Sequence, residues 1–335
     1  MTSKLRVGVV GTGRMGGRHA RNIHTYVGEA RLAAVMDVDS DRASQIAALA
    51  GATVFTDGEA LIASDVVDAV IIASPDPTHA ALALACLEQR KPALVEKPVA
   101  TELDDAAALV EREASLGRRL LQVGLMRYYD PRHVGVKDAV DAGAVGRPLM
   151  FRGWHRNPRE ATPQTSAEVL INSAVHDLYT ARWLLGQEVT EIYVRGTTID
   201  PQRTDQLDLQ LVTMAMSGGA LASVEVSQDS GFGYEVGVEI TGPKGVVSTP
   251  PHHTPLVRHD GEIGQRVDPD WLERFATAYI LEVQAWSAAV VNGRSHGPSA
   301  WDGYLTLAAA LAGADSIDRG APVEVEIPER PALYA

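Results

Sequence analysis

Short apolar runs alternate with amphipathic stretches along the first 125 residues of the chain. Such runs predict buried strands, and stretches with apolar residues at every third or fourth position predict helices. The expected strands are Leu5 to Val10, Leu32 to Met36, Ala69 to Ala73, Ala93 to Glu96 and Leu120 to Gly124. The expected helices are Gly16 to Tyr26, Asp41 to Ala50, Pro77 to Glu88 and Leu103 to Leu116. This order predicts a doubly wound α/β domain over residues 1–125, with helices on both faces of a parallel sheet.

The pattern changes after about Pro148, where strand-like runs follow one another with short turns. The expected strands are Leu149 to His155, Val189 to Thr197, Leu207 to Met216, Ala220 to Ser227 and Glu235 to Thr241, with a loop at Pro250 to Asp268 and helices at Trp271 to Asn292 and Trp301 to Arg319. Successive strands predict an antiparallel sheet. We therefore predict a second α/β domain over residues 126–335, with a large, open, mainly antiparallel sheet and C-terminal helices able to pack back on the first domain.

Size and composition agree with a globular protein of two domains. The chain has 335 residues, more than one hydrophobic core usually serves. Hydrophobic residues make up 45% and charged residues 22%, which is ordinary for a folded protein.

Charge and cysteine content narrow the partners and the compartment. Lys and Arg number 30 against 43 Asp and Glu, a net charge of −13, and no basic run could follow a nucleic-acid backbone. No apolar run approaches the ~20 residues that span a bilayer, and no cleavable signal precedes the first strand. The single cysteine, Cys86, cannot form an internal disulfide. We expect a cytoplasmic protein that binds neither nucleic acid nor membrane.

A glycine-rich turn joins the first strand to the first helix, with the sequence Gly11-Thr12-Gly13-Arg14-Met15-Gly16. Gly11 allows a sharp turn, Gly13 leaves room for a pyrophosphate, and Gly16 lets the helix pack close to the strand. The helix N-terminus then offers N–H groups and a positive dipole end to phosphate. The motif predicts a Rossmann dinucleotide site, and a plain tight turn is the simpler alternative.

An acidic residue selects between two dinucleotides. Asp37 stands 21 residues after Gly16, at the end of the second predicted strand. A carboxylate at this position accepts hydrogen bonds from the ribose hydroxyls and repels a 2′-phosphate. We therefore expect NAD rather than NADP.

A second motif, Glu96-Lys97-Pro98, follows the strand Ala93 to Glu96 at the carboxyl edge of the predicted sheet. Ligands bind at this edge in doubly wound folds. A lysine fixed there could donate a hydrogen bond to a reacting oxygen. From spacing alone, a solvated loop lysine is equally compatible with the sequence.

These motifs occur in an order that resembles the Gfo/Idh/MocA oxidoreductase family over nearly the whole chain. The resemblance includes the glycine turn, Glu96-Lys97-Pro98 and the later segment Asn172 to Asp177. Within the family, four segments are similar to bacterial inositol 2-dehydrogenases: Gln122 to Asp130, His155 to Pro158, Asn172 to Asp177 and Gly297 to Tyr304. The resemblance implies a Rossmann domain, a polyol site between the domains, and a C-terminal sheet that forms a homodimer or homotetramer interface.

The resemblance also implies the roles of two residues. Lys97 would lie beside the substrate hydroxyl, and His176 would be the general base that accepts its proton. Imidazole suits this role because its ordinary pKa is about 6.5. A structural histidine is the alternative for His176.

One position departs from the family pattern. The inositol dehydrogenases typically carry Asp four residues before the histidine, whereas this chain has Asn172. On a helix this spacing places both side chains on one face. Asn keeps the hydrogen bonding and loses the charge. Either the enzyme works with an uncharged partner for His176, or its substrate is a related sugar, glycoside or cyclitol.

The remaining site residues follow from the same resemblance. For the cofactor we expect Gly11, Thr12, Gly13, Arg14, Met15, Asp37, Ser74, Pro75, His79, Glu96 and Lys97. For the substrate we expect Met126, Arg127, His155, Asn157, Asn172, His176 and Tyr234, with Asp177 beside them. Lys97, His176 and Asn172 form the expected catalytic group.

No metal is expected. His252, His253 and His259 lie in a Pro-rich segment that lacks acidic or cysteine ligands at metal-binding spacing. The leading hypothesis is NAD-dependent oxidation of a secondary hydroxyl of a cyclitol of the myo-, scyllo- or chiro-inositol type. The alternatives are a dehydrogenase for a sugar or glycoside, such as an aldose or C-3 of a glucoside, and a non-catalytic regulator that senses the dinucleotide.

Overall fold

The computed structural model describes residues 4–159, 164–199, 206–250 and 254–335. Internal contacts divide the chain into two compact units. Unit 1 comprises residues 1–126, 277–307 and 328–335, and unit 2 comprises residues 127–276 and 308–327. The sequence analysis placed its boundary after residue 125 and left the C-terminal helices free to join either domain. Contacts assign residues 277–307 to unit 1.

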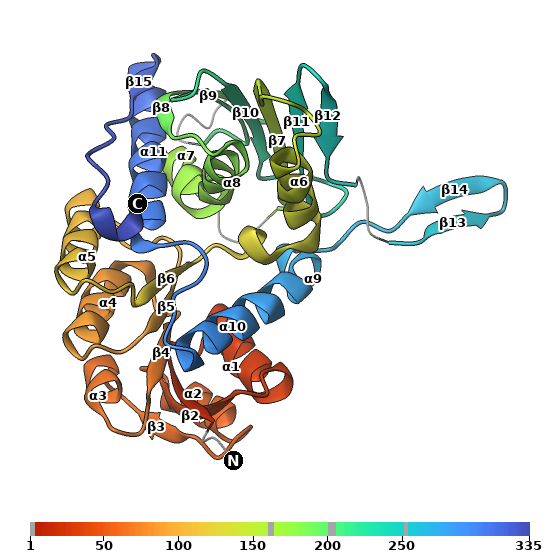
Figure 1. Ribbon diagram of the computed structural model, residues 1–335. Helices are drawn as coiled ribbons and strands as arrows, with labels where there is room; N and C mark the ends of the chain where they lie inside the picture. The colour runs from red at the N-terminus through yellow and green to blue at the C-terminus, as the bar shows by residue number, and fades with distance from the viewer. Residues whose placement is uncertain (1–3, 160–163, 200–205, 251–253) are drawn as a thin grey trace. The chain divides into compact units, whose positions relative to one another are not determined.

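Unit 1 is built on a six-stranded parallel sheet with the order β3-β2-β1-β4-β5-β6 (Figure 1). Its strands are β1 Leu5–Val10, β2 Ala30–Met36, β3 Thr53–Phe55, β4 Ala69–Ile72, β5 Ala93–Glu96 and β6 Leu121–Gly124. The order reverses between β1 and β4, as in dinucleotide-binding folds, where ligands bind at the carboxyl ends of the strands. The predicted Rossmann sheet is confirmed.

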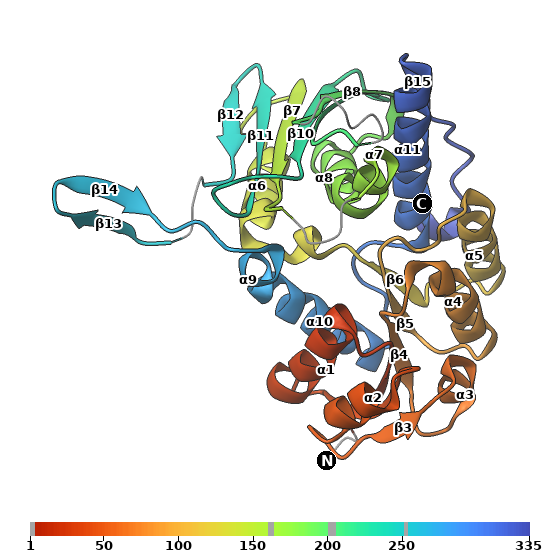
Figure 2. The same ribbon diagram turned by 180° about the vertical axis from the view of Figure 1, so that it is seen from behind.

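Helices cover both faces of the sheet of unit 1. In Figures 1 and 2, α1, α2 and α10 lie on one face, and α3, α4 and α5 lie on the other. Their bounds are α1 Arg14–Tyr26, α2 Ser40–Ala47, α3 Gly58–Ala63, α4 His79–Glu88, α5 Leu103–Ser115 and α10 Ala276–Val291, with short 3₁₀ turns Asp76–Thr78 (η1) and Ala332–Tyr334 (η4). The core under α1 is continuous with Val283 and Trp286 of α10. The sequence analysis missed β3 and α3, which are too short to show a periodic pattern.

Unit 2 contains a seven-stranded sheet with the order β12-β11-β7-β10-β9-β8-β15. The strands are β7 Met150–Arg156, β8 Val189–Thr197, β9 Leu209–Met216, β10 Leu221–Ser227, β11 Glu235–Gly242, β12 Gly245–Ser248 and β15 Val323–Glu324. Every neighbouring pair is antiparallel except β7 with β10. The predicted mainly antiparallel sheet is confirmed. The expected succession without helices was wrong between β7 and β8, where the chain forms helices before it returns to the sheet.

Helices pack on one face of this sheet, and side chains on the other face are exposed. The helices are α6 Pro131–Asp141, α7 Ser166–Val169, α8 Val175–Leu185 and the last part of α11 Ala300–Arg319, which continues from unit 1. The single-turn helix α9 Trp271–Arg274 directly precedes α10, and a 3₁₀ turn Met126–Tyr129 (η2) lies at the boundary. Along β9, buried residues alternate with exposed ones such as Leu209 and Leu211, the pattern of a half-covered sheet. Among the described residues, no helix combines the length and apolarity needed to cross a membrane.

A separate hairpin extends from unit 2 (Figures 1 and 2). Its strands are β13 Leu256–His259 and β14 Glu262–Gln265, and they pair with each other. Asp260 and Gly261 form the two-residue turn, with φ values of 50° and 81°. The expectation of a loop was therefore wrong for residues 256–265. The Asp-Gly pair at positions 260 and 261 is itself a hairpin signal.

Candidate active site

The glycine-rich turn of unit 1 leaves no space for side chains at two positions and leaves space at a third. Gly11 has φ of +82°, and a Cβ there would lie 2.5 Å from the Ala73 carbonyl oxygen. A Cβ at Gly16 would lie 1.7 Å from the Gly11 carbonyl oxygen. A Cβ at Gly13, by contrast, would meet no heavy atom within 4 Å. Gly11 and Gly16 therefore form the turn, and the space beside Gly13 is open for a ligand.

Asp37 connects the end of β2 to this turn. One of its carboxylate oxygens accepts hydrogen bonds from the backbone N–H of Thr12 at 2.7 Å and from the Thr12 hydroxyl at 2.8 Å. The other accepts from the Asp39 N–H at 3.0 Å and from Arg42 at 3.2 Å. Burial would raise the pKa of Asp37, but these hydrogen bonds and the Arg42 charge hold it below its usual range. Asp37 is therefore a fixed anion beside the turn.

Lys97 lies between Glu96 and Pro98, and each of these two neighbours contacts a buried histidine. The Glu96 carboxylate lies 2.6 Å from Nε2 of His19 on α1. The Pro98 carbonyl lies 2.7 Å from Nδ1 of His79, whose Nε2 lies 2.8 Å from the Ser74 carbonyl. Both histidine side chains are fully or almost fully buried. The backbone on each side of Lys97 is thereby fixed at the carboxyl edge of the sheet.

The other residues predicted for the cofactor also lie at this edge. Ser74 and Pro75 follow β4, and the Thr78 hydroxyl lies 2.6 Å from the Ser74 hydroxyl and donates to the Pro75 carbonyl at 2.7 Å. Arg14 is exposed in the first turn of α1, and Met15 is half-buried. Unit 1 thus brings the predicted cofactor residues together at one edge of the sheet.

Unit 2 buries a cluster of four polar side chains, all of which the sequence analysis placed at the substrate site. The Arg127 guanidinium donates to the Asp177 carboxylate at 2.5 and 3.3 Å. Nδ1 of His155 lies 2.8 Å from the same carboxylate, and its Nε2 lies 3.1 Å from the Tyr234 hydroxyl. Exposure is 1% for Arg127, 0% for Asp177, 3% for His155 and 2% for Tyr234. We call these four residues the polyol cluster, after the substrate class that the sequence resemblance implies for them.

Electrostatics fix the charge of each member of the polyol cluster. Burial alone would raise the pKa of Asp177, but the Arg127 and His155 side chains hold it well below its usual range. Burial lowers the pKa of His155 despite Asp177, so this imidazole is neutral at pH 7. Burial raises the pKa of the Tyr234 hydroxyl. The cluster therefore holds one ion pair and two neutral hydrogen-bonding groups.

A second buried network, which the sequence analysis missed, supports the polyol cluster. Arg274 donates to both oxygens of Asp130 at 2.9 Å, and Nδ1 of His133 lies 2.5 Å from that carboxylate. The Arg274 guanidinium lies over the Phe275 ring at 4.4 Å, and the ring of Tyr234 meets Phe275 edge-on at 6.3 Å. Asp130 and Arg274 are 144 positions apart, so no local pattern could have paired them.

Asn172 and His176 lie on consecutive parts of one helical segment. Residues Leu170–Ala174 form a π-helical turn (η3), and His176 is in the first turn of α8. His176 is buried, with 9% exposure, and its carbonyl accepts from the Thr180 hydroxyl at 2.6 Å. A π-turn inserts a residue into the helical repeat and is frequent at functional sites. The regular one-turn spacing expected between the two residues is therefore altered here.

Two further predicted residues flank these groups. Met126 is buried at the end of unit 1, and Asn157 is buried after β7, with its amide donating to the Ser227 carbonyl at 3.3 Å. Among the histidines considered for metal, His252 and His253 lie outside the described residues, and His259 is exposed in the hairpin beside Asp260.

Comparisons with known proteins agree with this geometry. A family model described as "Oxidoreductase family, NAD-binding Rossmann fold" matches residues 5–125, and the GFO/IDH/MocA C-terminal domain model matches residues 133–248. The class that the fold and the site define is thus an NAD-binding oxidoreductase. The chain belongs to the Gfo/Idh/MocA family, which confirms the family expected from the sequence.

Relatives are similar over the whole chain. An inositol 2-dehydrogenase of Rubrobacter xylanophilus is 50% identical over 335 residues, covering 99% of this chain and 96% of the relative. An inositol 2-dehydrogenase of Saccharopolyspora erythraea is 42% identical, covering 98% and 99%. The crystal structure of Lactobacillus casei myo-inositol dehydrogenase with NAD(H) and myo-inositol superposes with a TM-score of 0.95 at 30% identity, covering 99% and 100%.

Two glycine substitutions should separate folding from cofactor binding. Gly16→Ala places a methyl group against the Gly11 carbonyl and should destabilise the fold by about 1–3 kcal/mol or more. Gly13→Ala meets no protein atom and should cost about 1 kcal/mol or less, yet it should weaken NAD binding about tenfold or more. Thermal unfolding and calorimetric NAD titration measure the two effects. Unchanged NAD affinity in Gly13→Ala would contradict the open ligand space.

Removing the buried anion of the polyol cluster should destabilise the protein strongly. Asp177→Asn leaves the Arg127 charge buried and unpaired, which should cost about 3–5 kcal/mol at pH 7. Because the folded pKa of Asp177 is depressed, its contribution is complete above the unfolded pKa of about 3.9 and is lost as pH falls through the folded pKa. Denaturant unfolding at several pH values measures it.

The exposed pair of Arg6 and Asp68 offers the matched control for this substitution. Their side chains are 38% and 39% exposed, so Asp68→Asn should cost about 1 kcal/mol or less. Equal losses in Asp177→Asn and Asp68→Asn would show that burial of the cluster does not govern its energy.

Proposed function

We propose that this protein is an NAD-dependent inositol dehydrogenase that oxidises a secondary hydroxyl of a cyclitol to the ketone. The observation that carries the proposal is the full-length similarity to inositol 2-dehydrogenases, which reaches 50% identity among the relatives described. Myo- and scyllo-inositol dehydrogenase structures share the fold, the latter with a TM-score of 0.89 at 26% identity. A cytoplasmic location is part of the proposal.

The residues of unit 1 fit NAD. The space beside Gly13 suits a pyrophosphate, and the N-cap of α1 has no side chain that occupies the helix N-terminus. The ionised Asp37 suits ribose hydroxyls and disfavours a 2′-phosphate. Bound NAD⁺ supplies the acceptor for the hydride that leaves the alcohol carbon.

Side chains of the protein accept the proton of the substrate hydroxyl and stabilise the charge left on its oxygen. As the alcohol loses hydride, its hydroxyl becomes acidic, and His176 accepts the proton. The Lys97 ammonium donates a hydrogen bond to the oxygen and stabilises the negative charge that develops there. Asn172 orients the histidine or a substrate hydroxyl through its amide.

Polyol recognition requires several buried groups that exchange hydrogen bonds with hydroxyls. We assign this role to Tyr234 and Asn157, whose polar groups are neutral. Both ring nitrogens of His155 already contact Asp177 and Tyr234, so His155 orients the Tyr234 hydroxyl in this proposal. Arg127 has a different role in the proposal, because both of its terminal nitrogens contact Asp177 or His155. In the proposal, Arg127 holds Asp177 and His155 in place and does not itself hydrogen-bond to a substrate hydroxyl.

One observation, the amide at Asn172, favours a second substrate class. An amide in place of the family's carboxylate leaves the neighbourhood of His176 less negative, which suits an aldose or a glycoside as well as an inositol. Such substrates carry the same secondary hydroxyl chemistry.

We also propose a homodimer or homotetramer that forms through the open face of the unit 2 sheet. Exposed leucines on neighbouring strands support this surface: Leu209 and Leu211 on β9 and Leu221 on β10, which are 38%, 46% and 58% exposed. Apolar side chains that gather on one face mark interaction surfaces.

Loss of either reactive side chain should abolish turnover without loss of cofactor binding. Lys97→Met and His176→Asn should each lower kcat about 10²- to 10⁴-fold, because each removes one proton-handling group. NADH absorbance with myo-, scyllo- and chiro-inositol, glucose and a glucoside measures turnover. NAD affinity, from calorimetry, should stay within about twofold.

Matched controls are available for both substitutions. Lys137→Met removes a surface lysine paired with Asp141, and His259→Asn removes an exposed hairpin histidine, so both should leave kcat unchanged. NAD binding by the wild-type protein without turnover of any polyol would overturn the enzymatic proposal in favour of a dinucleotide-sensing regulator.

Restoring the family's carboxylate should change the pH dependence. In Asn172→Asp the added charge favours protonated His176, so the acid limb of kcat/KM should move to higher pH by about one unit. Asn172→Ala separates lost hydrogen bonding from added charge, and rate profiles over the substrate panel measure both. An unchanged pH profile together with unchanged substrate preference would show that residue 172 takes no part in the reaction.

A further inference from the structure

Phe275 contacts both of the buried polar networks of unit 2. It has 0% exposure and directly follows Arg274, the last residue of α9. The Arg274 guanidinium lies 4.4 Å from the centre of its ring, and the Arg127 guanidinium of the polyol cluster lies 5.9 Å from the same centre. The Tyr234 ring meets the Phe275 ring edge-on at 6.3 Å. The two networks therefore share one buried aromatic ring.

The backbone of Tyr234 is bound to the same segment of chain. Its N–H donates to the Asp268 carbonyl at 2.8 Å. Gly233, which precedes it, has φ of +122°, and a Cβ there would lie 2.8 Å from the same carbonyl oxygen. The segment 268–275 thus contacts Tyr234 at both of its ends, through the backbone at Asp268 and through the ring of Phe275.

An ion pair fixes the far end of this segment to the start of α6. Arg274 donates to both carboxylate oxygens of Asp130 at 2.9 Å, and Asp130 is the N-cap residue of α6. Burial would raise the pKa of Asp130, but His133 and Arg274 hold it well below its usual range, so Asp130 is an anion. A bidentate pair of this kind fixes orientation as well as distance. The place of the neighbouring Phe275 ring therefore depends on Asp130.

The Tyr234 hydroxyl lies at the end of this series of contacts. It is 3.1 Å from Nε2 of His155, while the ring that carries it packs on Phe275. A phenol hydroxyl discriminates between substrates only when its ring and its hydrogen-bonding partner are both held in place. His155 supplies the partner, and Phe275 supplies the packing.

We propose that Asp130, Arg274 and Phe275 position the Tyr234 hydroxyl and thereby determine which pattern of substrate hydroxyls the site accepts. We call these three residues the support group. The inference rests on the proposed function, in which Tyr234 binds a substrate hydroxyl. The support group does not touch the substrate in this proposal; its members are positioning residues that act through Tyr234.

The first test changes the ion pair without removing its charge. Arg274→Lys keeps a cation beside Asp130 but loses the planar fork and the flat contact with Phe275. The KM for inositol should rise about tenfold while kcat stays within about threefold, because a hydrogen bond made in both the ground state and the transition state is weakened. NAD affinity, from calorimetry, should stay within about twofold.

Phe275→Leu tests the same series of contacts at its next step. This substitution keeps an apolar side chain and leaves Arg274 and Asp130 unchanged, but it removes the ring on which Tyr234 packs. The KM should again rise about tenfold with little change in kcat. Wild-type KM values in both Arg274→Lys and Phe275→Leu would overturn the positioning role.

A double-mutant cycle tests whether the effect passes through Tyr234. Tyr234→Phe removes the hydroxyl on which the support group acts. In this background Arg274→Lys should change KM by less than about twofold, because residues that act as one unit are not additive. Each single variant should also discriminate less well than wild type between an inositol and its monodeoxy derivatives. Full additivity of the two KM effects would overturn the proposal.

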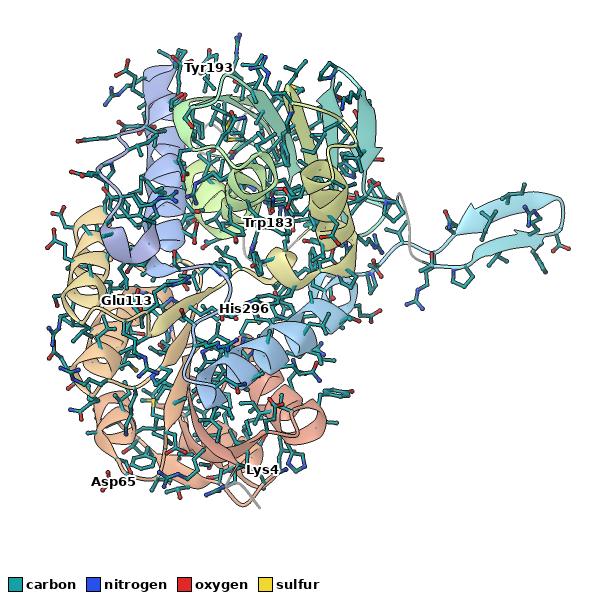
Figure 3. All side chains as sticks on the ribbon, in the orientation of Figure 1. Lys4, Asp65, Glu113, Trp183, Tyr193 and His296 are labelled. Atoms are coloured by element: carbon teal, nitrogen blue, oxygen red, sulfur yellow. The ribbon has the colours of Figure 1, made fainter. Side chains whose placement is uncertain are left out.

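Arg182 provides the matched control. It lies on α8 next to Trp183, which Figure 3 labels, and it has 5% exposure. Its Nε donates to the Glu188 carboxylate at 2.5 Å, so it is also a buried arginine of unit 2 in an ion pair. Arg182→Lys and Arg274→Lys should each lower the unfolding temperature by about 2–4 °C, but Arg182→Lys should leave KM unchanged. An equal rise of KM in both variants would indicate a general weakening of unit 2 and would overturn the specific role.

A second measurement does not need turnover. In apo-protein labelled with carbon-13 at the tyrosine Cζ atoms, the NMR signal that Tyr234→Phe removes reports the surroundings of the Tyr234 hydroxyl. This signal should shift or broaden in Arg274→Lys and Phe275→Leu and stay unchanged in Arg182→Lys. An unchanged signal in both support-group variants would overturn the proposal.

Failure of this inference can be distinguished from failure of the proposed function. A wild-type protein that turns over no polyol would refute the proposed function and, with it, the effect on substrate recognition. The Tyr234 signal would still decide whether the support group positions the hydroxyl. Turnover of an inositol with unchanged KM in the support-group variants would instead refute the positioning role alone.

Discussion

The cost of burying charge governs the polar architecture of both units. A carboxylate removed from water must be paired, hydrogen-bonded or protonated. Asp177 is paired with Arg127, Asp130 with Arg274, and Asp37 accepts hydrogen bonds from the turn that it faces. Each of these ion pairs or hydrogen bonds joins two segments of the chain to one another. The same interactions that neutralise these charges therefore define the geometry of the candidate site.

Backbone packing sets the position of Lys97 as firmly as charge does. Glu96 ends a strand that pairs with β6, and its side chain packs closely over Gly124, where a Cβ would lie 3.0 Å from its carboxylate. On the other side of the lysine, His79 joins the Pro98 carbonyl to the loop after β4. The lysine side chain remains half-buried, while its backbone has little freedom. Preorganisation of this kind reduces the reorganisation that a reaction requires.

The sequence predicted the parts of the structure that depend on local pattern. The strands β1, β5 and β8 have the bounds expected from apolar runs, and the glycine turn follows from spacing. The contact of Glu96 with His19 and that of Asp130 with Arg274 could not be predicted, since these partners lie 77 and 144 positions away. The π-turn before His176 could not be predicted either, because no local sequence pattern separates a π-turn from an ordinary helical turn. Family resemblance supplied the candidate residues, whereas only the fold shows which of them contact one another.

In the proposed function, substrate choice follows from the neutrality of the polyol cluster. The Arg127 and Asp177 charges cancel, His155 and Tyr234 are neutral, and residue 172 adds no charge. If these residues bind the substrate, as proposed, this balance of charge favours a neutral substrate that is recognised through hydrogen bonds. Buried groups that lack a hydroxyl partner lose free energy, so such a site rejects a polyol with a missing hydroxyl more strongly than one with an extra methylene. Under the proposed function, selectivity among cyclitols and sugars then depends on which hydroxyls meet these neutral groups rather than on overall charge.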